Sequence, residues 1–221
     1  MKLNIKDVGY TALSWTGTLV VRVAAILVGF VMVPLGLAFT KLPEPDVTEW
    51  QHISLPWWCD PWDNVRDGAM GDKRMWWWNV GYKPWFDKLP PKANSFIKAF
   101  WWLAVRNSVN KMARYYPGFG CPIDKCEIEY IGDYLVGDDL GQEGFQYVKA
   151  VGPTFNYYSV YHHIKLPLWT QKIGWLKGRA IIARMGHKVE PRHADKDWSL
   201  EEPTKRFKNW TFRPYMLQKV D

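Results

Sequence analysis

Residues 9–39 read GYTALSWTGTLVVRVAAILVGFVMVPLGLAF and contain a single charged residue, Arg22. As a helix this stretch would be about 46 Å long, more than the ~30 Å hydrocarbon core of a bilayer requires. Residues 23–40 carry no charge at all, and their number lies at the lower limit for a spanning segment. Residues 1–40 are therefore predicted to form a transmembrane or membrane-inserted anchor helix.

Polar and small residues recur along this segment in steps of three and four, at Thr11, Ser14, Thr18, Arg22, Ala25 and Gly29. Such a narrow stripe differs from the broad polar face of a helix lying in the membrane plane. It is typical of a spanning helix that packs against another helix, with Arg22 reaching the lipid headgroups. Three alternatives remain: a cleaved signal peptide, a buried helix of a soluble fold, and a re-entrant hairpin turning at Arg22.

The distribution of lysines predicts an orientation for this helix. Lys2 and Lys6 precede it, whereas Lys41 follows it beside three carboxylates, Glu44, Asp46 and Glu49. The positive-inside rule then favours a cytoplasmic N-terminus, with the bulk of the chain outside the cytoplasm.

The composition of the 221 residues is that of a globular chain, 48% hydrophobic and 23% charged. A mean hydropathy of −0.30 excludes a polytopic membrane protein but not a single anchor. The net charge of +7 is spread among residues of both signs. A polybasic nucleic-acid-binding arm is therefore absent from the sequence.

Ten of the fifteen tryptophans lie between Trp50 and Trp102. Trp50 lies in a proline-broken linker, residues 41–56, and the other nine lie in a tryptophan-rich helical segment, residues 57–120. Basic residues interleave with the indoles, and such a mixture suits the headgroup region of a bilayer. We expect the interface to include Trp57, Trp58, Trp76, Trp77, Trp78, Trp101 and Trp102. An aromatic core and base stacking on single-stranded nucleic acid by Trp76–Trp78 are the alternatives.

One amphipathic helix is predicted within this segment, from Asn94 to Tyr116. Asn94 or Ser95 can cap its start, and Pro117–Gly118 can end it. It would lie along the bilayer surface or cover the C-terminal sheet.

Four aspartates, Asp60, Asp63, Asp67 and Asp72, fall within thirteen residues. Carboxylates this close can bind a divalent ion, although the spacing fails the EF-hand pattern. The favoured interpretation is a turn, because Asp-Asn and Asp-Gly bond to their own backbone. A metal-dependent phosphodiester-cleaving enzyme using Asp63, Asp67 and Asp72, with His52 nearby in sequence, is the alternative function.

Three cysteines, Cys59, Cys121 and Cys126, do not make a disulfide framework. A Cys121–Cys126 bridge would close a small loop, and the spacing does not favour zinc. The adjacent His162 and His163 face opposite sides of a strand and so cannot chelate one ion together. No nucleophile-base pair or nucleotide-binding motif is present, and the sequence predicts no catalytic residue, metal site or cofactor.

Residues 121–221 are predicted to form a small antiparallel β domain with a charged tail. Strands are expected at residues 126–131, 145–151, 155–166 and 179–189, in a meander of four to six strands. The tail, residues 190–221, would be anchored onto the sheet by Trp198, Trp210 and Phe212. The fold class is thus α+β.

Short motifs in this chain resemble those of a family of small proteins encoded by tailed bacteriophages and prophages. They are Asp63-Asn64, Asp67-Gly68 and Gly71-Asp72 ahead of a tryptophan, followed by Trp102-Leu-Ala-Val-Arg106-Asn107 and by Arg184-Met-Gly186-His187-Lys188. Ser108 and His187 stand where that family has proline and tryptophan, and extra residues separate Gly68 from Asp72. The family has no established activity, so the resemblance implies a viral source and little chemistry.

Together these features predict a membrane-anchored bacteriophage protein of non-enzymatic, interaction type at the host cell envelope. Its partners would be the lipid bilayer and either another protein or a second copy of itself. Nucleic acid is the less favoured partner.

Overall fold

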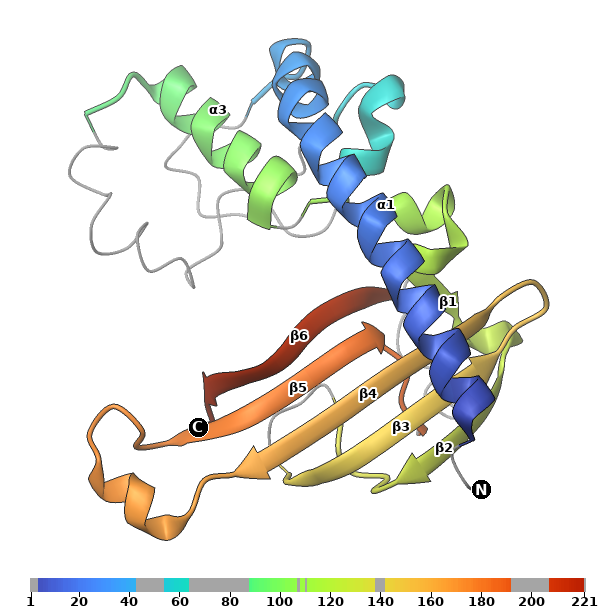
Figure 1. Ribbon diagram of the computed structural model, residues 1–221. Helices are drawn as coiled ribbons and strands as arrows, with labels where there is room; N and C mark the ends of the chain where they lie inside the picture. The colour runs from blue at the N-terminus through green and yellow to red at the C-terminus, as the bar shows by residue number, and fades with distance from the viewer. Residues whose placement is uncertain are drawn as a thin grey trace. The chain divides into compact units, whose positions relative to one another are not determined.

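The computed structural model describes residues 4–42, 54–63, 88–106, 108–109, 111–137, 142–191 and 207–220. The chain forms two compact units, one of residues 1–18 with 116–221 and the other of residues 19–115. Helix α1, Ile5–Ala38, contributes residues to both units. The fold is α+β, as predicted, with a long apolar N-terminal helix, short helices and an antiparallel sheet (Figure 1).

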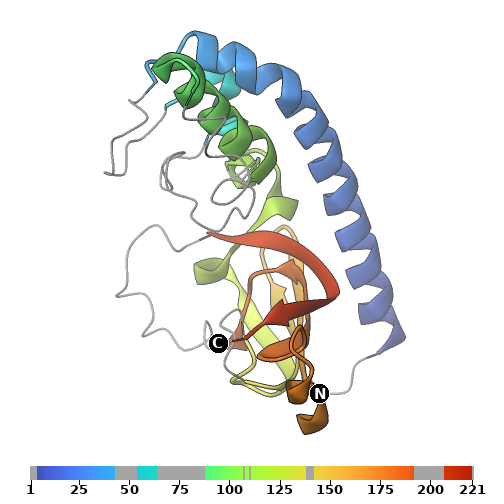
Figure 2. The same cartoon turned by 90° about the vertical axis from the view of Figure 1, so that its left-hand side faces the viewer.

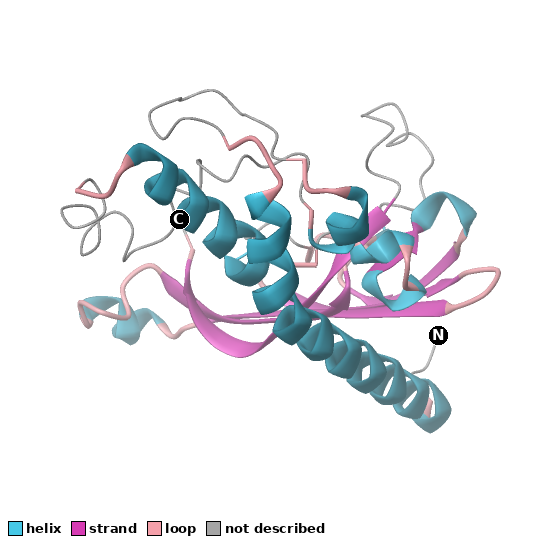
Figure 3. Cartoon of the chain, turned by 90° about the horizontal axis from the view of Figure 1, so that it is seen from above, coloured by secondary structure: helices cyan, strands magenta, loops and turns pink. Residues whose placement is uncertain are grey.

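A single-layered antiparallel sheet dominates the first unit (Figure 3). Its strand order is β1-β6-β5-β4-β3-β2, so consecutive strands from β2 to β6 pair as neighbours and confirm the predicted meander. The bounds are β1 Gly120–Pro122, β2 Glu127–Gly132, β3 Gly144–Val151, β4 Asn156–Lys165, β5 Arg179–His187 and β6 Phe207–Lys219.

Residues 207–219 of the predicted charged tail form a strand of the sheet, because β6 pairs with β5 and, at its start, with β1. Residues 192–206 of that tail, which include Trp198, lie outside the described part of the chain. The register between β5 and β6 shifts between Ile182 and Arg184, whose partners are Met216 and Arg213. Pro214 lies in the extra length of β6 at this bulge, where a residue without an N–H is tolerated. Because a proline stands in the middle of β6, the alternation of apolar and polar residues that indicates a strand is interrupted in its sequence.

The first turns of α1 lie against one face of the sheet (Figures 1 and 2). The hydroxyl groups of Thr11 and Tyr147 on β3 are 3.0 Å apart. The Trp15 indole Nε1 donates to the Tyr158 carbonyl of β4 at 3.1 Å. Residues 5–18 therefore belong structurally to the first unit, which we call the β unit.

Gly186 of β5 permits this close approach. Its φ is +94°, and a Cβ there would overlap the Tyr158 carbonyl oxygen and lie 2.5 Å from Trp15 Nε1. Only glycine adopts such a conformation without strain and leaves room for the indole.

The opposite face of the sheet carries an apolar core cluster of the β unit. Side chains alternate between faces along a strand, so Val148 and Ala150 of β3 share a face with Tyr157 of β4. They pack with three further buried side chains, Cys121, Ile123 and Val189.

The second unit consists of the rest of α1 and several short helices. These are η1 Trp57–Trp62, α3 Pro91–Phe100, η3 Trp101–Arg106 and η4 Met112–Arg114. The single helix predicted for residues 94–116 is thus wrong in extent. Proline at the first helical position favours the earlier start at Pro91. Val109 has a φ of 55°, which interrupts the helix before Lys111.

Candidate functional site

The second unit exposes an apolar side of α1. Val20, Leu27 and Val31 each expose more than three-fifths of their surface. They recur with other exposed apolar residues at helical spacing, Val23, Val28, Phe30, Leu35 and Phe39. No charged residue lies among them, and Arg22, the one charge of the segment, is half-buried. By length and composition, α1 is the one helix in the described part of the chain that could cross a bilayer.

The other side of this part of α1 is covered by η1. The Trp62 indole Nε1 donates to the Ala25 carbonyl at 2.7 Å, and the Cys59 thiol donates to the Met32 carbonyl at 3.2 Å. Gly29 leaves room for the Trp62 ring, because a Cβ there would come within 2.8 Å of it. The small-residue stripe seen in the sequence is therefore the covered side of α1.

In the β unit, too, the stripe is the covered side of α1, because Thr11 and Thr18 are buried there. Asp7, one turn before Thr11, lies 3.7 Å from Lys149 Nζ of β3. The stripe thus packs against a sheet in one unit and an indole in the other, whereas we expected another helix.

The predicted interfacial tryptophans differ in exposure. Trp57 is almost fully exposed, whereas Trp58 and Trp101 are half-buried and Trp102 is buried. The Trp58 ring contacts Phe39 at the end of α1, with 6.3 Å between ring centroids. The residues Trp76, Trp77 and Trp78 lie outside the described part of the chain.

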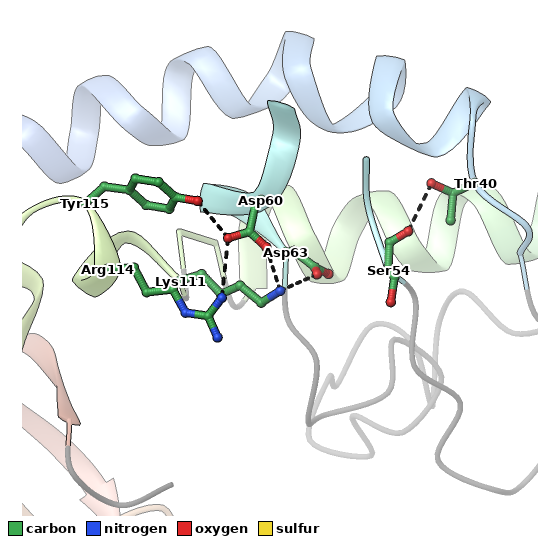
Figure 4. Close-up of polar contacts among 7 residues, drawn as sticks. All are labelled: Thr40, Ser54, Asp60, Asp63, Lys111, Arg114 and Tyr115. Atoms are coloured by element: carbon green, nitrogen blue, oxygen red, sulfur yellow. Dashed lines mark hydrogen bonds and ion pairs between the residues drawn. The ribbon is translucent and has the colours of Figure 1, made fainter. Parts of the chain in front are cut away.

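Asp60 and Asp63, at the end of η1, converge on one lysine (Figure 4). Lys111 Nζ donates to Asp60 Oδ1 at 2.8 Å and to Asp63 Oδ2 at 2.6 Å. The Tyr115 hydroxyl donates to Asp60 Oδ2 at 2.9 Å, and Arg114 lies 3.6 Å from the same oxygen. We call these five residues the Lys111 cluster.

The charges of the Lys111 cluster shift the pKa values of Asp60 and Lys111. Burial alone would raise the pKa of Asp60, but hydrogen bonds from Lys111 and Tyr115 outweigh it and lower that pKa. Burial would likewise lower the pKa of Lys111, yet its two aspartate partners raise it. Burial, aided by these carboxylates, raises the pKa of the nearby Cys59 to about 11. The cluster is a charge-compensated structural element within the second unit.

Among the described residues, no three His, Cys, Asp or Glu side chains gather as metal ligands would. Asp63 instead binds an ammonium group. The remaining acidic and motif residues of this region, His52, Asn64, Asp67, Gly68, Asp72 and Asn107, lie outside the described part. Arg106 ends η3.

The last sequence motif occupies the interior of the β unit. His187 is fully buried; its Nε2 lies 3.0 Å from the Gly118 carbonyl oxygen, and its Nδ1 accepts from the Tyr158 amide at 3.2 Å. Burial lowers the pKa of His187 to about 4. His187 is therefore a neutral structural residue near pH 7. Arg184 is buried as well.

Cys121 and Cys126 are free thiols in this structure, with their sulfur atoms 3.8 Å apart. Burial raises the pKa of Cys121, and the hydrogen bond from Cys121 lowers the pKa of Cys126. Cys126 is thus the more acidic thiol of the pair.

Sequence reasoning missed a second exposed apolar segment, the connection between β4 and β5, which contains helix η7, Leu168–Lys172. Its exposed side chains are Leu168, Trp169 and Trp175, and three exposed lysines accompany them, Lys165, Lys172 and Lys177. The alternation of indole and lysine in residues 165–177 was the available signal.

One comparison with known proteins found a match: the model of a "Family of unknown function (DUF7338)" matches residues 6–215. The matched range includes nearly all of α1 and every strand up to Tyr215 of β6. No curated protein and no solved structure matches the chain.

Proposed function

Because this chain belongs to the DUF7338 family, whose function is unknown, we propose its function from its surfaces. We infer a membrane-anchored protein of non-enzymatic, interaction type. The resemblance to phage-encoded proteins supports a viral source, so the membrane would be that of an infected bacterial host. The partner would be a protein of that envelope or a second copy of this chain.

The observation that carries this proposal is the exposed apolar side of α1. An exposed stripe of Val, Leu and Phe over five helical turns is costly in water, at about 25 cal/mol for each Å² of apolar surface. Contiguous apolar surface of this kind marks an interaction site or a membrane contact. The absence of charge and the exposed Trp57 and half-buried Trp58 near the end of α1 favour lipid as the occupant.

The exposed segment between β4 and β5 supports the same function. Tryptophan combines an apolar ring with a polar N–H and is enriched at membrane-water interfaces. The adjacent lysines would attract an anionic lipid surface, at about 1 kcal/mol for each basic residue near it.

Liposome flotation of matched variants tests the proposal. Leu27 on α1 and Leu135 between β2 and β3 are both 64% exposed, so Leu27→Asp and Leu135→Asp lose the same amount of apolar surface and gain the same charge. A carboxylate in the hydrocarbon costs about 3 kcal/mol, which is roughly a 100-fold loss of partitioning. We expect Leu27→Asp to reduce flotation strongly and Leu135→Asp to float like the native chain. Native protein that stays with the soluble fraction would refute the membrane function.

A further inference from the structure

The β unit contains residues that precede the apolar part of α1 in the sequence and residues that follow it. Residues 5–18 contact the sheet through the Thr11–Tyr147 and Trp15–Tyr158 hydrogen bonds. The sheet itself consists of strands β1 to β6, which lie between residues 120 and 219. Residues 5–18 and these strands must therefore lie on the same side of any membrane in which this unit is folded.

A complete crossing by α1 would require a second crossing before residue 116. Residues 19–38 would span about 30 Å as a helix, enough for the hydrocarbon core. Between residues 41 and 115, however, the longest run without Asp, Glu, Lys or Arg is the ten residues 50–59. A return helix needs about 20 predominantly apolar residues. The chain that follows α1 thus has no segment able to cross back.

We propose that the chain is a monotopic membrane protein: the exposed side of α1 enters the bilayer from one side, and the N-terminus and the whole β sheet remain on that side. The inference rests on the proposed membrane function. It replaces the orientation expected from the lysines, in which the N-terminus and the bulk of the chain lie on opposite sides.

The two sides of α1 fit this arrangement. A helix in the membrane plane needs a polar side that faces away from the lipid. Here the protein supplies that side, because Trp62 covers Ala25 and Gly29 in one unit and β3 contacts Thr11 in the other. The helix therefore needs no broad charged face of its own, while Val20, Leu27 and Val31 remain available to the acyl chains.

Accessibility of introduced cysteines tests the topology in full-length protein expressed in bacteria. Lys6, Lys41 and Lys177 are exposed and lie before α1, just after α1 and in the sheet connection. Each is changed to cysteine separately, and a membrane-impermeant maleimide is applied to intact spheroplasts and to lysed ones. The native chain controls for its own cysteines; Cys59, which is buried, cannot serve as the reporter.

The monotopic arrangement predicts the same pattern for Lys6→Cys, Lys41→Cys and Lys177→Cys, with all three protected or all three labelled in intact spheroplasts. Protection of Lys6→Cys with labelling of the other two, or the reverse, would overturn the monotopic proposal and leave the membrane function standing. Native protein in the soluble fraction would overturn the membrane function, and the topology with it. The two proposals thus fail by different readouts.

Discussion

Replacing Lys111 with methionine would remove the ammonium group that neutralises two carboxylates in the second unit. The Asp63 side chain is 3% exposed and that of Asp60 is 21% exposed, so neither regains full hydration in the variant. Removing one partner of a buried ion pair costs about 3–5 kcal/mol, because a charge is left uncompensated. We expect Lys111→Met to lower the free energy of unfolding by about 3 kcal/mol, the lower end of that range, since Asp60 keeps the Tyr115 hydrogen bond.

Arg114→Met provides the matched control. Arg114 contacts the same Asp60 at 3.6 Å, but its side chain is 66% exposed. An exposed ion pair contributes about 0–1 kcal/mol. Each variant therefore loses one positive charge beside Asp60, and Lys111 differs from Arg114 in its burial and in its second partner, Asp63.

The assay is urea unfolding of the full-length chain in detergent micelles at pH 7, followed by tryptophan fluorescence. Adding Asp63→Asn to Lys111→Met should restore part of the lost stability, because the double variant no longer buries that charge. A Lys111→Met variant no less stable than Arg114→Met would refute the claim that Lys111 compensates the charge of buried and partly buried carboxylates in this cluster.

The remaining predictions concern the β unit. Gly186→Ala should lower the free energy of unfolding by about 3 kcal/mol, because the φ of this residue is strained for alanine and the new Cβ would overlap a carbonyl oxygen. Gly174→Ala is the control, because nothing lies within 4 Å of its new Cβ, and it should leave the free energy of unfolding unchanged in the same urea titration. Because the pKa of His187 is lowered from 6.5 to about 4, the unfolded chain takes up this proton first as the pH falls. The contribution of neutral His187 to the free energy of unfolding is complete above pH 6.5 and should fall by about 3 kcal/mol on acidification to pH 4. In the His187→Gln variant, the free energy of unfolding should depend less on pH over this range. Iodoacetamide should modify Cys126, whose pKa is lowered by its neighbouring thiol, before the buried Cys59, whose pKa is raised to about 11; mass spectrometry of a time course at pH 7.5 would show the order, and equal rates would contradict it.

Local sequence patterns were sufficient for much of the fold. The apolar residues 9–39 predicted α1, and alternating aromatic and β-branched residues predicted β2 to β5. Both signals arise because helix and strand periodicities are properties of neighbouring residues. Strand β6 was not predicted from the sequence, because Pro214 and the bulge beside it interrupt that periodicity.

The candidate site could be predicted only in part. The stripe from Thr11 to Gly29 showed which side of α1 would be covered, but not by what. The Lys111 cluster joins residues 48 and 51 positions apart, and no local pattern links Asp63 to that lysine. The local sequence is therefore compatible with both a turn and a metal site at Asp63, and only the tertiary structure shows that its carboxylate binds Lys111.

The sequence by itself determined that residues 9–39 form an apolar helix with one polar edge. The tertiary structure alone decided that the polar edge is covered by the chain's own sheet and by Trp62, which leaves the apolar side exposed. The physical reason is that periodicity specifies which side of a helix must be covered, whereas the covering group is chosen by long-range packing between segments far apart in the chain.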